Sequence, residues 1–308
     1  MGFFLEVLIG GLLAGVLYSL VALGFVLIFK ASGVFNFAQG AMVLTAALAL
    51  VRSLDIMQGQ WHWPFGVALA AAFAFAGLVM ALVAWGAEKL VLRKLVNQEG
   101  IILFMATIGL TFFLEGLAQT VFGADVYPLH IGLPKDPMFI LESVFDGGIL
   151  VNELDIWAAV IAGLLVAVLA VFFQKTRIGR ALRAVADDHA AAQSVGIPLN
   201  QIWFIVWLVA GLVALVAGAV WGSKLGVQFS LSLLALKALP VLVLGGFTSV
   251  PGAIVGGLII GAGEKISEVF LGPAMGGGIE IWFAYVLALL FLLVRPQGLF
   301  GERIIERV

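Results

Sequence analysis

Apolar positions in this chain fall into long runs, separated by short stretches that hold most of the polar residues. A membrane-spanning helix needs about 20 mostly apolar residues, and nine runs approach that length. The second and seventh runs are short and could be broken or re-entrant segments. The pattern predicts an all-α, polytopic membrane helix bundle of about 8–9 transmembrane segments, at Val7–Phe29, Phe37–Leu54, Phe65–Ala87, Ile101–Phe122, Ile156–Phe173, Ile202–Trp221, Leu231–Gly246, Pro251–Leu271 and Ile279–Val294.

Basic residues between the runs predict the orientation of the bundle. Loops on the cytoplasmic side carry an excess of lysine and arginine, whereas the stretch 123–155 is acidic and is expected outside. The amino terminus is therefore expected outside and the carboxyl terminus in the cytoplasm. The basic residues follow the third, fifth and ninth runs: Lys89, Arg93 and Lys94; Lys175, Arg177, Arg180 and Arg183; Arg295, Arg303 and Arg307.

The whole chain, residues 1–308, is expected to form a single transmembrane domain. Two of its polar loops are longer than simple connections between helices. The extracytoplasmic loop, residues 123–155, contains several prolines and is expected to be irregular. In the cytoplasmic loop, residues 174–200, the segment Gly179–Ser194 lacks proline and is rich in good helix formers. Its apolar residues recur near helical spacing, and Gly196 with Pro198 would end a helix there. A short amphipathic cytoplasmic helix is predicted.

Composition narrows the class of protein. Of the 308 residues, 63% are hydrophobic and only 11% are charged, with a net charge of −2, and the mean hydropathy is +1.18. Soluble domains carry about 25% charged residues. The chain has no cysteine, its three histidines form no metal-ligand motif, and no GxxxxGK[ST] phosphate loop is present. We expect no catalytic, metal or cofactor site in this chain, so that any ATP would be bound by another chain.

The densest motif is a glycine-rich run near the carboxyl terminus. The pairs Gly252/Gly256 and Gly257/Gly261 each have GxxxG spacing, which permits close helix approach in membranes. Helix packing is the favoured interpretation of these four residues.

A few polar residues within the apolar runs are candidates for more specific roles. Asn36 and Gln39, beside a glycine at the start of the second run, could line a polar path or cap a helix, and the residues do not decide between the two. For Glu115, a structural role is favoured over a proton relay. Lys237 precedes Pro240 and could satisfy the carbonyls that proline frees, or extend to the membrane surface.

These motifs together resemble the LivH-type permease subunits of bacterial ATP-binding-cassette importers for branched-chain (hydrophobic) amino acids. The resemblance is carried, in the same order, by NFAQG at 36–40, TIGLTFFL at 107–114, the segment 179–197, the glycine-rich run 245–264 and RPQGLFG at 295–301. One residue departs from the pattern: Ala41 stands where the family commonly has glutamate.

The resemblance implies a permease rather than an enzyme, in the bacterial inner membrane, with a second related permease, two cytoplasmic ATPases that hold ATP and Mg, and an extracytoplasmic binding protein as partners. The substrate would be a branched-chain or related amino acid. The alternative is an ion- or proton-coupled secondary transporter. The expected substrate path uses Asn36, Gln39 and Thr107. The expected ATPase-coupling residues are Arg177, Arg180, Arg183, Asp187, Asp188 and Gly196.

Overall fold

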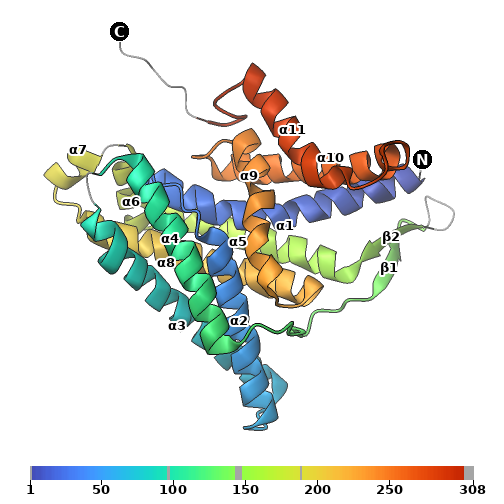
Figure 1. The fold of residues 1–308 in the computed structure, drawn as a ribbon, viewed down its shortest axis with the longest axis horizontal. Helices are drawn as coiled ribbons and strands as arrows, with labels where there is room; N and C mark the ends of the chain where they lie inside the picture. Colours follow the sequence, from blue (N-terminus) through green and yellow to red (C-terminus); the bar gives the residue numbers. More distant parts are fainter. Residues whose placement is uncertain (1, 96–97, 143–147, 188, 302–308) are drawn as a thin grey trace. The chain divides into compact units, whose positions relative to one another are not determined.

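The computed structural model describes residues 2–95, 98–142, 148–187 and 189–301, which are mostly helical (Figure 1). The helices are α1 (Gly2–Ser32), α2 (Gln39–Gly59), α3 (Phe65–Gly86), α4 (Gly100–Phe122), α5 (Glu153–Lys175), α6 (Arg177–Asp187), α7 (His189–Ser194), α8 (Leu199–Leu225), α9 (Leu234–Gly245), α10 (Val250–Met275) and α11 (Ile279–Val294). Short π and 3-10 turns, η1 (Ala87–Val91), η2 (Leu92–Lys94) and η3 (Phe229–Leu233), extend α3 and precede α9.

Membrane-spanning helices are fewer than the nine apolar runs suggested. Within the described residues, six helices are long and apolar enough to cross a bilayer: α1, α2, the α3–η2 segment, α4, α5 and α8. The seventh and eighth runs form a pair, Phe229–Gly245 and Val250–Met275, bent by 113°, which would make a seventh span if it crosses as one. The last run, α11, has only 16 residues. The structure therefore does not confirm the expected count of 8–9 spans, because hydropathy measures the length of an apolar run and not the bend between two runs.

Two compact units make up the chain. The first contains the described residues up to Ala22, from Gly132 to Leu164 and from Leu236 onward. The second contains Leu23–Ile131 and Leu165–Ala235. In the second unit, α2 packs against α3, α4 and α8, and most of its residues are buried. The small side chains of α3 that face inward, Ala68, Ala72, Ala76 and Ala84, follow the helical repeat and allow this packing.

The loop 123–155 contains two strands, although its prolines indicated an irregular structure. Strands β1 (Pro137–Ile140) and β2 (Ile149–Asn152) pair antiparallel, with Pro137 opposite Asn152 and Ile140 opposite Ile149 (Figure 1). The expectation of an irregular loop is wrong for these residues. The alternation of buried and exposed positions in β2 is that of a strand, but four residues are too few for this period to stand out in a sequence.

Candidate functional site

Helix α6 presents three exposed arginines, Arg177, Arg180 and Arg183, which we call the arginine surface. The opposite face of α6 is apolar: Leu182 is 2% exposed and Val185 is fully buried. This division of the helix is the amphipathic pattern expected from the sequence. The apolar face packs on α8, so the arginine surface stands on a helix that is fixed to one of the long membrane helices.

The start of α6 is set by Thr176. Its hydroxyl accepts a hydrogen bond from the backbone N–H of Gly179 at 2.9 Å and donates one to the carbonyl of Phe172 at 2.6 Å. A side-chain oxygen in this position satisfies an N–H that a helix start leaves without a partner. At Gly179 an added Cβ would meet the carbonyl oxygens of Phe172 and Phe173. Glycine is therefore needed for α6 to follow the end of α5 so closely.

On either side of position 188, the described residues of the expected helix are helical, as α6 and α7. Asp188 lies outside the described residues, and the Asp187 side chain is likewise not described. Gly196 has a left-handed φ of +85°, and the N–H of Ile197 donates to the carbonyl of Ala192 at 3.0 Å. This is the glycine-terminated helix end that the sequence predicts. Just before it, Val195 leaves 76% of its surface exposed.

The polar residues 36–39 lie in the break between α1 and α2. Asn36 is fully buried, and its side-chain oxygen accepts from the backbone N–H of Ala38 at 3.1 Å. Thr107 of α4, 1% exposed, accepts from the N–H of Phe37 at 3.1 Å, and its hydroxyl lies 3.1 Å from the carbonyl of Phe35. The structure thus brings Asn36, Gln39 and Thr107 into one region of the second unit, where Asn36 and Thr107 bond to backbone groups.

Gln39 differs from its two neighbours. It is fully buried, its carbonyl oxygen accepts a weak hydrogen bond from the Asn36 amide at 3.4 Å, and its Nε2 has no partner among the described residues. Leaving a buried donor without a partner costs about 1–3 kcal/mol. The side chain lies directly against Gly24 of α1, where any added Cβ would collide with it. Gln39 is therefore the polar group in this region with hydrogen-bonding capacity left over.

Helix α10 uses its glycines on two faces within the first unit. Cβ atoms added at Gly252 and Gly256 would meet backbone atoms of α9, including those of Gly245. Cβ atoms added at Gly257 and Gly261 would meet backbone atoms of α1, including those of Gly15. The helix begins at Ser249, whose hydroxyl accepts from the N–H of Gly252 at 3.0 Å. Two neighbouring helices thus approach α10 at backbone distance.

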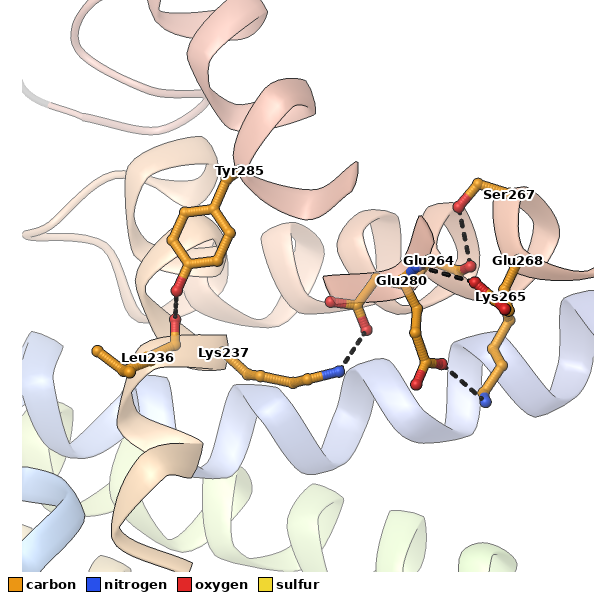
Figure 2. A network of polar contacts seen from close by, with 8 residues as sticks. All are labelled: Leu236, Lys237, Glu264, Lys265, Ser267, Glu268, Glu280 and Tyr285. Atoms are coloured by element: carbon orange, nitrogen blue, oxygen red, sulfur yellow. Dashed lines mark hydrogen bonds and ion pairs between the residues drawn. The ribbon is translucent and has the colours of Figure 1, made fainter. Parts of the chain in front are cut away.

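One turn beyond this glycine contact is an ion pair that the sequence did not suggest. Figure 2 shows Lys237 of α9 extending toward Glu264 of α10, and their charged atoms are 3.6 Å apart. The Glu264 side chain is 3% exposed and that of Lys237 is 33% exposed. Tyr18 of α1 adjoins both groups: its ring centre is 5.6 Å from the Lys237 nitrogen, and its hydroxyl is a hydrogen-bond partner of Glu264.

The carbonyl that Pro240 frees is satisfied by a tyrosine, not by Lys237. Proline lacks the N–H that would bond to the carbonyl four residues earlier, which is that of Leu236. The hydroxyl of Tyr285, on α11, donates to this carbonyl at 2.8 Å (Figure 2). Tyr285, and not Lys237, therefore donates the hydrogen bond to the Leu236 carbonyl.

The connection between α10 and α11 carries a more exposed polar set. The Glu268 carboxylate accepts from the N–H groups of Gly278 and Glu280, each at 3.0 Å, and so caps the start of α11. Lys265 and Glu280 form an ion pair at 3.4 Å in which both side chains are partly exposed. Exposed pairs of this kind contribute about 0–1 kcal/mol. Glu115, by contrast, is half-buried on α4.

Comparison with known proteins identifies the family. Residues 7–295 match the family model of the branched-chain amino acid transport system permease component. The chain is 28% identical to the high-affinity branched-chain amino acid transport permease LivH of Salmonella typhimurium, over 99% of this chain and 98% of that one. It is 28% identical to BraD, the corresponding permease of Pseudomonas aeruginosa, with the same coverage.

A more distant relative carries a different substrate in its name. The fructose import permease FruG of Bifidobacterium longum is 25% identical over 71% of this chain and 65% of its own length. The full-length matches favour an ATP-binding-cassette importer over the ion- or proton-coupled alternative. With a family match that spans almost every described helix, this chain belongs to the permease components of branched-chain amino acid transport systems.

Proposed function

We propose that this chain is the transmembrane permease subunit of an ATP-driven importer for branched-chain or related small amino acids in the bacterial inner membrane. The observation that carries the proposal is the family match across residues 7–295. In this arrangement the amino terminus is outside and the carboxyl terminus is in the cytoplasm, as the positions of the basic residues indicate.

The assembly would contain a second related permease and an extracytoplasmic binding protein that delivers the substrate. Two cytoplasmic ATPases would hold the ATP and Mg, since this chain contains no phosphate-loop motif of its own.

The arginine surface of α6 is the proposed contact with one ATPase. Its three cations are exposed, and Val195, which follows α7 and is 76% exposed, adds apolar area to the same segment. An interface that combines arginine with apolar side chains is typical of protein recognition. Because the buried face of α6 packs on α8, movement of the ATPase would displace α8 with it. ATP drives the change only if it binds the two states with different affinities.

The proposed substrate path in the second unit includes Asn36, Gln39 and Thr107. Gln39 is the strongest candidate of the three, because its Nε2 donor is buried and has no partner among the described residues. A passing substrate carboxylate or carbonyl would accept from it.

Purification of the chain from its native membrane in a mild detergent, followed by mass spectrometry of what accompanies it, tests the proposal. We expect a second permease and two soluble ATPases in fixed proportion. A chain that purifies alone, under conditions in which other ATP-driven importers of the same membrane stay assembled, would overturn the proposal.

A further inference from the structure

Helix packing brings Lys237 and Glu264 together. Gly257, Gly261 and Glu264 lie on one face of α10, at helical spacing. The two glycines bring the α1 backbone close, and α1 then covers the Glu264 carboxylate. Lys237 comes from the bent partner helix α9. The two charges therefore meet where three helices of the first unit are in contact, next to Tyr18.

Stability alone does not account for such a pair. Removing a carboxylate from water costs several kcal/mol, and replacing a buried ion pair by well-packed apolar side chains is often neutral or stabilising. The separation of 3.6 Å between Lys237 and Glu264 is also longer than the roughly 2.7–2.9 Å of a strong charge-assisted hydrogen bond. The pair is thus neutral as a whole, while each member has bonding capacity that the other does not fill.

We propose that Lys237 and Glu264 form an exchange site for a zwitterionic α-amino acid, in which Lys237 takes the substrate carboxylate and Glu264 takes its ammonium group. This inference rests on the proposed function and extends it to a site in the first unit. Binding replaces one protein ion pair by two protein–ligand pairs, so no net charge enters an apolar region. Lys237, which is one-third exposed, is the member that a ligand reaches first.

The same argument selects among substrate classes. An amide, urea or sugar has no formal charge, so it could separate Lys237 from Glu264 only by leaving both charges without an opposite partner. A carboxylic acid that lacks an amino group would leave Glu264 unpaired, and an amine that lacks a carboxylate would leave Lys237 unpaired. Unpaired buried charges carry a large penalty. The site therefore favours zwitterions over all of these.

The test uses the complete importer in proteoliposomes, with uptake of radiolabelled leucine and ATP hydrolysis measured in the same vesicles. The double variant Lys237→Gln/Glu264→Gln removes both charges. Glutamine matches the length of glutamate and is one atom shorter than lysine. We expect leucine uptake to fall at least about tenfold, while hydrolysis stimulated by the loaded binding protein stays within about twofold of wild type. The control, Lys265→Gln/Glu280→Gln, removes the exposed pair between α10 and α11 and should change neither measurement.

Two results would overturn the proposal: uptake and stimulated hydrolysis falling together, which would make the pair a structural support, or neither falling. Should the double variant not assemble, Glu264→Asp keeps both charges and withdraws the carboxylate by one methylene. The Glu264→Asp variant should lower uptake at least about fivefold with ATP hydrolysis retained. Unchanged uptake by this variant would overturn the proposal. If the wild-type vesicles show no ATP-driven uptake, the proposed function fails before this site is tested.

Discussion

The segment α6–α7 and the helix α10 meet opposite physical requirements. Helix α6 keeps Arg177, Arg180 and Arg183 exposed and buries only one apolar face. Helix α10 has glycines on two faces and buries the Glu264 carboxylate. A surface that binds another protein needs side chains that extend into solvent. A helix that packs closely against two others needs glycine or other small residues at the contacts. Substitutions at the α10 glycines should therefore disturb assembly, whereas substitutions of the exposed α6 arginines should disturb only function.

The largest expected effect is at the glycines of α10. Gly257→Leu or Gly261→Leu would drive a side chain into the α1 backbone, so we expect a loss of stability of at least about 3 kcal/mol and little assembled complex. Gly163→Leu on α5 is the control, because an added Cβ there meets nothing within 4 Å. Size-exclusion profiles and membrane yield measure the effect. Normal yield of both α10 variants would contradict the close packing of α10.

A smaller effect is expected on the buried face of α6. Leu182 is 2% exposed, so Leu182→Ala should lower stability by about 2–4 kcal/mol. The control is Ile178→Ala on the same helix, where 40% of the side chain is already exposed and stability should hardly change. Thermal unfolding in detergent compares the two variants. Equal losses would mean that the deeper burial of Leu182 contributes nothing to stability.

Removal of the α6 cap should have a local effect. Thr176→Ala deletes the hydroxyl that accepts from the Gly179 N–H, which should cost about 1 kcal/mol. Hydrogen exchange of the first-turn amides of α6 should become faster, with α10 unchanged. Thr120→Ala is the control, because that hydroxyl is exposed and donates to a carbonyl within α4. Unchanged exchange in α6 would remove the role given to Thr176.

The smallest effect concerns the carbonyl freed by Pro240. Tyr285→Phe removes the hydroxyl that donates to the Leu236 carbonyl, at a cost of about 1 kcal/mol. Alanine at position 240 would restore the missing N–H, so Tyr285→Phe should cost less in the Pro240→Ala background. A double-mutant cycle on thermal stability measures this difference. Strictly additive losses would show that the tyrosine serves another purpose.

Local patterns predicted most of the helices correctly, because an apolar run long enough for a bilayer has few other structures available. The same holds for the end of the segment 179–197, where Gly196 adopts the left-handed conformation. The short seventh run was consistent with a broken or re-entrant segment, but the angle of 113° to the eighth run is not contained in hydropathy. The Lys237–Glu264 pair was not predicted, because helical spacing identifies partners within one helix and these residues belong to two helices.

The grouping of polar residues around the α1–α2 break was anticipated from the sequence only in part. Asn36 and Gln39 stood out as amides beside a glycine, but that Thr107 bonds to the backbone at Phe35 and Phe37 depends on how α4 packs. The sequence left open whether the two amides cap a helix or line a path. In the structure Asn36 bonds to the local backbone, while Gln39 keeps an unused donor.

The central claim is that the arginine surface couples this permease to an ATPase. Its most direct test is ATP-driven leucine uptake by reconstituted importers that carry Arg180→Glu/Arg183→Glu, with Lys94→Glu, an exposed lysine in η2, as control. We expect normal membrane insertion, uptake lowered at least about tenfold by charge repulsion and lost contacts, and control uptake close to wild type. Wild-type uptake by the double variant would show that the arginine surface does not couple to the ATPase.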